Sequence, residues 1–136
     1  MYRLFTLREA TRLLPVVDEH LGALQSAASD LGRLRERLAV VPEASVEGRN
    51  LTTEVSFLLG VVHTSKAELD RLGVRVRDIE EGIVDFPSQL GAEVVVLSWE
   101  RGQDAITHYR RLNGDAETRL LPNADSETQP PDGASA

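Results

Sequence analysis

The side chains of this sequence that are suited to chemistry gather in one acidic stretch, DIEEGIVD, at residues 78–85. Asp78, Glu80, Glu81 and Asp85 are the four carboxylates within it. Carboxylate oxygens are the ligands that Mg²⁺ and Ca²⁺ take, so the stretch could hold a divalent cation. The alternative is a turn in which Asp78 and Asp85 accept hydrogen bonds from backbone amides. We favour the turn, because the sequence lacks the D-x-D-x-D-G loop of an EF-hand.

A second pair of candidate metal ligands lies further along, at Asp104 and His108. Four positions make about one helical turn, so the two side chains could share a metal if this segment is helical. Two ligands do not make a site without a third, and an ordinary surface pair is the favoured interpretation. The metal hypothesis therefore uses Asp78, Asp85, Asp104 and His108 together, in a metal-binding protein or a metal-dependent hydrolase.

Asp85 allows another interpretation, because it lies inside an apolar strand pattern. Alternation along a strand sends Val84 and Phe86 into the core and Asp85 to the other face. If helices cover that face, Asp85 is buried and needs a partner, for which Arg75 or Arg77 is available. A buried aspartate–arginine pair that sets strand register would explain the residue without catalysis. Such a carboxylate would also be of the perturbed kind that active sites use.

Other catalytic groupings are missing from the sequence. There is no Cys, which excludes disulfides, thiolate zinc sites and cysteine nucleophiles. The sequence has no Gly-rich phosphate loop, no G-x-S-x-G, no H-E-x-x-H and no nucleotide fingerprint. We therefore favour a protein that is not an enzyme and has no cofactor.

Composition and charge exclude several kinds of partner. A chain of 136 residues fits one domain, and an aromatic content of 4% favours long helices with a core of Leu, Val and Ala. A net charge of -7 has the wrong sign for neutralising phosphates, so we expect no nucleic acid partner. The apolar runs are far shorter than the roughly 20 residues of a membrane span, and the start lacks a signal-peptide pattern. We expect a cytoplasmic protein that does not bind membranes.

Two long helices should position these residues. Thr6 and Glu9 form a capping box, and apolar residues at alternating steps of three and four then predict a helix over 7–40. A second helix is predicted over 51–72, packed antiparallel to the first in a partly coiled-coil hairpin. Because the first helix is the longer, part of its apolar seam has no partner within the hairpin. We expect that overhang to meet the sheet or a second subunit, which makes a homodimer the predicted assembly.

A small antiparallel sheet should follow over residues 74–100, where the apolar period changes from 3.6 to two. PSQLGA is predicted to be a hairpin turn, with Pro87 ending one strand. A short helix is predicted over 103–112, which completes a single α+β domain at 1–113. The acidic, Pro-rich tail at 114–136 is predicted to be disordered.

Two parts of the sequence, FTLREATRLLP and DIEEGIVDFPSQLGAEVVVLSWERG, resemble a bacterial family known only as domain of unknown function 2203. The family's pattern opens with F-T-L-x-E-A-x-x-L-L-P, and continues with G-V-x-V-x-D, G-L/I-V-D-F-P and W-x-x-G-E. The matching residues are Phe5, Thr6, Leu7, Glu9, Ala10, Leu13, Leu14, Pro15, Gly73, Val74, Val76, Asp78, Gly82, Val84, Asp85, Phe86, Pro87, Trp99 and Gly102. The resemblance covers most of residues 5–112 and offers no established function.

The sequence departs from the family's pattern after Trp99. Gln103 stands where the pattern has Glu, and Tyr109, Arg110 and Arg111 stand where it has Trp-His-Glu. His108 lies two positions before the expected histidine, about 200° round the predicted helix, so it does not replace it. If the family's Glu and His bind a metal or do acid–base chemistry, the resemblance implies that this member has lost both. We therefore favour a structural or protein-interaction module that self-associates through its helical hairpin and has a further, unidentified protein partner.

Overall fold

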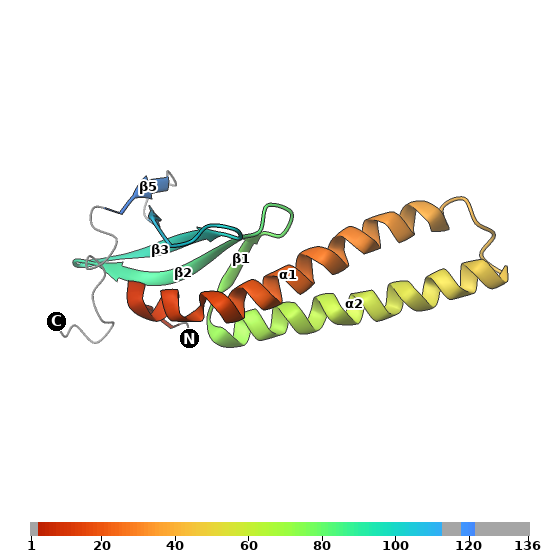
Figure 1. Cartoon of the computed structure of the whole chain (residues 1–136), viewed down its shortest axis with the longest axis horizontal. Helices are drawn as coiled ribbons and strands as arrows, with labels where there is room; N and C mark the ends of the chain where they lie inside the picture. Colours follow the sequence, from red (N-terminus) through yellow and green to blue (C-terminus); the bar gives the residue numbers. More distant parts are fainter. Residues whose placement is uncertain (1–2, 113–117, 122–136) are drawn as a thin grey trace.

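The computed structural model describes residues 3–112 and 118–121. Two long helices are followed by five strands that form one antiparallel sheet in sequence order (Figure 1). The elements are α1 (Leu7–Leu38), α2 (Val46–Leu72), β1 (Arg75–Asp78), β2 (Ile83–Leu90), β3 (Glu93–Glu100), β4 (His108–Arg111) and β5 (Thr118–Leu120). The predicted α+β class, a helical hairpin on a small antiparallel sheet, is confirmed.

α1 begins where the sequence predicts. The Thr6 hydroxyl accepts from the Glu9 amide at 3.0 Å, and the Glu9 carboxylate accepts from the Thr6 amide at 2.9 Å. These two bonds satisfy amides that the first turn leaves without helical partners. The helix continues through Pro15 and ends at Leu38, two residues before the predicted end.

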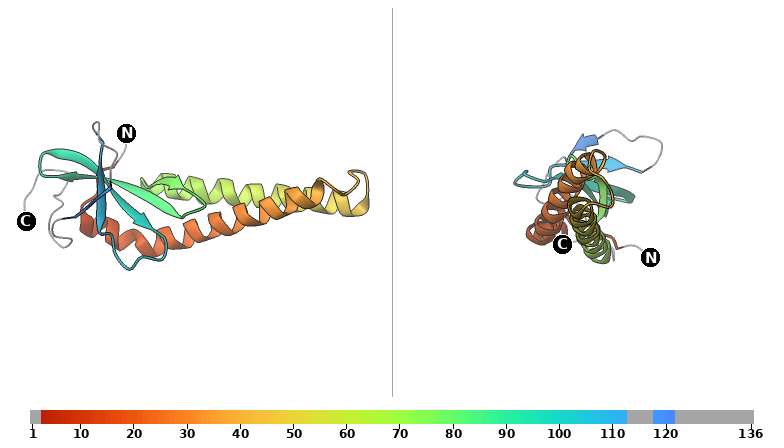
Figure 2. Two further views of the ribbon diagram at one scale, coloured as in Figure 1. Left: turned by 90° about the horizontal axis from the view of Figure 1, so that it is seen from above. Right: turned by 90° about the vertical axis from the view of Figure 1, so that its right-hand side faces the viewer.

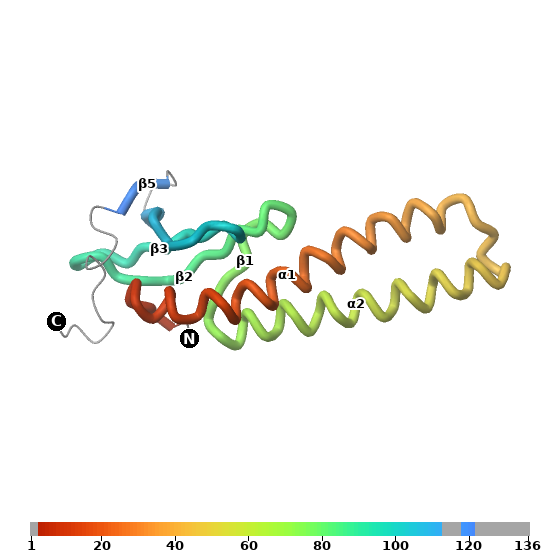
Figure 3. Tube along the Cα trace, viewed as in Figure 1, coloured from red at the N-terminus to blue at the C-terminus, as the bar shows by residue number. Residues whose placement is uncertain are grey.

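α2 begins at Val46, five residues earlier than predicted. Ser45 caps it in place of Asn50, and its hydroxyl accepts from the Gly48 amide at 2.9 Å. The end is as predicted, because Gly73 adopts the left-handed conformation (φ +90°) that closes the last turn. α2, with 27 residues, lies beside α1 along the hairpin but remains shorter than α1, with 32 (Figure 3). The first turns of α1 therefore extend past the end of α2, and their apolar side chains pack against the sheet, which is one of the two contacts expected for this overhang.

The sheet covers only one end of the hairpin. Val84 and Phe86 on β2 pair with Trp99 and Leu97 on β3, and all four side chains enter the core formed with α1. The main core reaches Leu24 on α1 and Val62 on α2, and the part of the hairpin beyond these two residues extends past the sheet as a two-helix arm (Figures 1 and 2).

Polar contacts along α1 hold the end of the sheet in place. The Gln25 amide donates to the Ile79 carbonyl at 3.0 Å, and the Arg101 guanidinium donates to Asp18 at 2.9 Å. The Arg101 guanidinium lies against α1 at Gly22. A β-carbon at this position would lie 2.6 Å from the guanidinium, so only glycine leaves enough space for it. Positions 18, 22 and 25 share one helix face, which is why one arginine reaches across it.

Pro87 lies within β2 instead of ending it, which corrects the predicted hairpin. β1 pairs with β2 only as far as Asp85, and the Pro87 carbonyl accepts from the Phe5 amide at 2.7 Å. Proline is tolerated here because this side of the strand lies beyond the end of β1, where no ladder hydrogen bond is lost. The turn between β2 and β3 is tight and uses Gly91 at φ +62°.

The short helix predicted over 103–112 is wrong, because His108–Arg111 forms β4 and pairs with β3. An apolar central strand offers an unpaired edge, and pairing with it outweighs the weak helical pattern of the segment. The predicted disordered tail also needs correction at Thr118–Leu120, which forms β5, followed by Leu121 at 4% exposure in the core. The remainder of the predicted tail lies outside the described residues.

Candidate functional site

Asp85 lies on the face of the sheet that is turned away from the helices, which we call the outer face. Its neighbours Val84 and Phe86 point to the helices, as the alternating pattern predicts. Asp85 is nevertheless 3% exposed. This burial was expected only if helices covered the face; side chains of neighbouring strands bury Asp85 instead.

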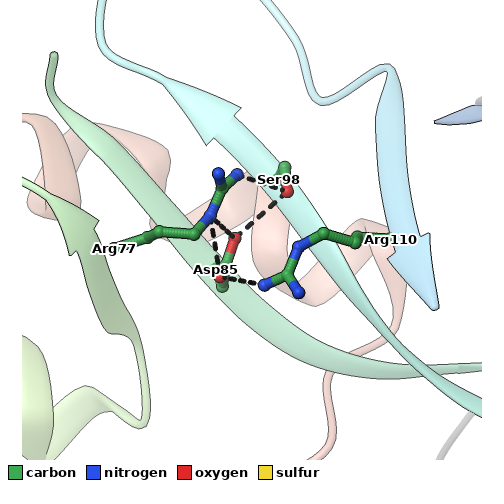
Figure 4. A network of polar contacts seen from close by, with 4 residues as sticks. All are labelled: Arg77, Asp85, Ser98 and Arg110. Atoms are coloured by element: carbon green, nitrogen blue, oxygen red, sulfur yellow. Dashed lines mark hydrogen bonds and ion pairs between the residues drawn. The ribbon is translucent and has the colours of Figure 1, made fainter. Parts of the chain in front are cut away.

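Four residues from four strands form a closed network on the outer face (Figure 4). The Arg77 Nε lies 3.2 and 3.3 Å from the two Asp85 oxygens, and the Arg110 Nη2 lies 2.9 Å from Asp85 Oδ2. The Ser98 hydroxyl donates to Asp85 Oδ1 at 3.1 Å and accepts from Arg77 Nη2 at 3.1 Å. The buried carboxylate is therefore paired with two arginines and hydrogen-bonded to a third partner, as a buried charge requires.

The strand register positions each member of the network. Asp85 pairs directly with Ser98 across β2 and β3. The pairing of β1 with β2 shifts between Val76 and Asp78, which leaves Arg77 as the extra residue of a bulge. Bulges redirect side chains, and here the redirected side chain is the one that reaches Asp85. Of the two arginines that the sequence offered as partners, the structure selects Arg77.

Arg110 is the member that the sequence analysis missed. A helix was predicted over 103–112, so Arg110 was not placed beside β3, where it pairs with Val96. His108 and the position of the family's histidine, held here by Arg110, are two residues apart and therefore share a face of the strand, whereas a helix would separate them by about 200°. His108 and Arg110 thus both lie on the outer face, opposite Ser98 and Val96 respectively. The apolar sequence of β3 could have revealed this strand, because it is typical of a central strand that pairs with a neighbour on each edge. The segment that contains Arg110 is the next one available to pair with it.

Asp85, Ser98 and His108 form one row across the outer face, but their order does not suit a catalytic triad. Ser98 lies between the other two and donates to Asp85, whereas a triad needs the histidine in the middle. The His108 Nδ1 lies 2.8 Å from the Thr107 hydroxyl instead. In this row Ser98 bridges Asp85 and Arg77, which is a structural role.

The remaining predicted metal ligands are not part of the network. Asp78 accepts from the Glu81 amide at 2.9 Å, as the favoured turn interpretation predicts. That interpretation is wrong for Asp85, which accepts from the side chains of the network and lies within a strand. Asp104 is exposed in the loop before β4. Among the described residues, no group of three or more His, Asp or Glu side chains is placed to hold a metal. The geometry adds nothing to the metal hypothesis, which stays a prediction.

Two hollows flank the network on the outer face. The smaller, of about 140 Å³, is lined by Arg75, Asp85, Pro87, Val96, Arg110 and Leu112. The larger, of about 260 Å³, is lined by Arg77, Ile83, Ser98, Trp99, Glu100, Gln103, His108 and Thr118. The larger hollow draws on all five strands, so the sheet is curved and its outer face is concave. A concave face with paired arginines at its centre is suited to binding.

The fold and this network define an α+β protein in which a helical hairpin supports a five-stranded meander with a buried arginine–aspartate centre. The chain belongs to the family described as uncharacterized conserved protein (DUF2203), whose model matches residues 3–120. Comparisons with curated proteins and with solved structures found no match. Within residues 3–112 and 118–121, no helix has the length and apolar character needed to cross a membrane.

Proposed function

We propose that this protein is a non-enzymatic interaction module that self-associates through its two-helix arm. The observation that carries the proposal is the stretch FLLGVV at residues 57–62, in the middle of α2. Its five apolar side chains spread over about 200° of the helix surface, and Gly60 lies in the remaining sector. An apolar stripe that faces one layer is about 100° wide, so α1 covers only part of this surface.

The exposure of individual side chains supports this argument. Leu58 and Val62 are half-buried, and Val62 packs against the main core. Phe57 is 69% exposed and Leu59 is 45% exposed. These two residues lie about 200° apart round the helix, so the uncovered apolar surface occupies both flanks of α2. Leu59 lines an open groove of about 610 Å³ together with Val74 and Val76, whereas Phe57 lies on the opposite flank.

Gly60 points to a close neighbour outside the described chain. A glycine inside a helix costs about 1 kcal/mol relative to alanine. No heavy atom lies within 4 Å of the position that a Gly60 β-carbon would occupy, so no described contact needs the glycine. A partner helix packed closely against α2 would make use of the missing side chain.

A second copy of the chain is the partner that fits this surface best. Two antiparallel helices form a single layer, and a second hairpin packed against the first completes a four-helix bundle with a shared core. Most soluble homo-oligomers are dimers with two-fold symmetry, in which the same patch serves both subunits. The overhang of α1 offers no such surface, because the sheet covers it.

Molecular mass in solution tests the proposal. Light scattering after size-exclusion chromatography should give twice the chain mass of 14.9 kDa for the wild type, over concentrations on the order of 1 to 100 µM. Phe57→Glu should give the mass of one chain, because it places a charge inside the interface. Val16→Glu, at another exposed apolar position that lies on α1, is the matched control and should remain dimeric.

The proposal fails if the wild type has the mass of one chain over the whole range. It also fails if Phe57→Glu stays dimeric. Helical content measured by circular dichroism should be the same in all three proteins, since both substituted positions are exposed.

A further inference from the structure

We propose that the smaller hollow on the outer face binds a small anionic ligand, through a carboxylate or phosphate group held between Arg75 and Arg110. This binding site is separate from the arm and does not depend on self-association. Both arginines line the hollow, which also contains an edge of Asp85.

The outer face carries more positive than negative charge at this point. Arg75, Arg77 and Arg110 surround one buried carboxylate, that of Asp85, although the chain as a whole has a net charge of -7. Arg75 lies opposite Asp85 in the strand register and takes part in no ion pair among the described residues. Asp70 shares an adjoining groove with Arg75, without an ion pair between them. One carboxylate cannot neutralise three guanidinium groups, which leaves an excess for an incoming anion.

Arg110 contributes a donor that the described residues leave without an acceptor. Its Nη2 binds Asp85, whereas its Nε is buried and has no hydrogen-bond partner. Buried donors are nearly always satisfied in proteins, so the unsatisfied Nε of a side chain that lines a hollow indicates a missing partner. A guanidinium presents its donors in a fixed fork that matches carboxylate and phosphate oxygens. Because Nε has almost no accessible surface, a small rotation of the Arg110 side chain would present it to an oxygen of the ligand.

The other walls of the hollow are apolar and indicate what the anionic group is attached to. Pro87, Val96 and Leu112 line it beside the two arginines, and Leu112 is 50% exposed at the rim. A volume of about 140 Å³ is small for a whole ligand, since ligand sites usually have about 300 Å³ or more. The hollow therefore suits the charged group and the adjoining carbons, with the rest of the molecule lying over Leu112.

Asp85 prepares the site without filling it. Its two oxygens hold the guanidinium groups of Arg77 and Arg110 in place, so little ordering remains to be done when an anion binds. The same two guanidinium groups repel a cation. The ligand class that follows is an anion, in contrast to the divalent metal of the sequence hypothesis.

Arginine Nε–H signals in ¹⁵N–¹H correlation spectra test the inference directly. The probes are inorganic phosphate and hexanoate, each titrated at constant ionic strength with sodium chloride as the balancing salt. We expect the Arg110 signal to shift and saturate with at least one probe, and the tighter probe identifies the charged group. Arg75→Gln should weaken that binding about tenfold, the usual effect of losing one charge-assisted hydrogen bond.

Arg12→Gln is the matched control, because Arg12 is an exposed arginine on α1, away from the sheet. It changes the net charge as Arg75→Gln does and should leave the affinity unchanged. The inference is overturned if neither probe gives a saturable shift. It is equally overturned if sodium chloride alone gives the same shift, or if Arg75→Gln and Arg12→Gln bind alike.

Discussion

Removal of the Asp85 charge should destabilise the protein by about 2 kcal/mol, because two arginines would lose their shared partner. Asp85→Asn keeps the size of the side chain and so opens no cavity. The Ser98 hydroxyl can still donate to the remaining amide oxygen, whereas Arg77 and Arg110 are left facing a neutral group.

The magnitude follows from the exposure of the two arginines. Breaking a fully buried ion pair by removing one partner costs about 3–5 kcal/mol. The side chains of Arg77 and Arg110 are 36% and 22% exposed, so water can solvate part of each unpaired charge. That solvation reduces the expected cost to about 2 kcal/mol, still well above the value for an exposed pair.

Urea unfolding followed by tryptophan fluorescence measures this change. Trp99 is the single tryptophan of the chain, is 3% exposed and lies on β3 beside the network, so its emission reports on the sheet. Asp104→Asn is the control, because Asp104 is exposed, and it should change the free energy of unfolding by less than about 0.5 kcal/mol.

The reasoning is refuted if Asp85→Asn also falls within about 0.5 kcal/mol of the wild type, the range of ordinary surface substitutions. A double-mutant cycle with Arg110→Gln gives a second criterion. The two substitutions should cost less together than the sum of their separate effects, by about 1 kcal/mol or more. Strict additivity would mean that the two side chains do not interact in solution.

Two further predictions concern the backbone and pH. Gly82→Ala should destabilise the protein by about 2 kcal/mol, because a β-carbon at φ +73° would also lie 2.8 Å from the Gln25 amide. Gly91→Ala, at φ +62° with open space around it, should cost only about 1 kcal/mol in the same urea assay. The hydrogen bond from Arg71 lowers the pKa of Glu68, so the stabilisation is present above the ordinary glutamate pKa and is lost as pH falls through the lowered value. Arg71→Gln should raise the Glu68 pKa measured by NMR titration, and an unchanged pKa would contradict the assigned cause.

Local patterns in the sequence predicted the helical hairpin well. The Thr6–Glu9 capping box and the Gly73 cap act within one turn of chain, so residue types alone locate these two helix ends. The start of α2 was harder to locate, because Ser45 and Asn50 are both acceptable caps. The structure uses Ser45, and the loop between the helices is correspondingly short.

From the sequence alone, Asp85 was expected to need a partner if its face of the strand were covered, and Arg75 or Arg77 was within reach. Strand alternation and the cost of burying a charge are sufficient for that conclusion. Tertiary structure alone decided that the partners are Arg77 and Arg110, that β4 exists, and that the outer face is concave. Those features depend on a bulge in β1 and on a strand that pairs with the free edge of β3, 8 residues after β3 ends. Such pairing is set by contacts between distant segments, which residue types within any one segment do not encode.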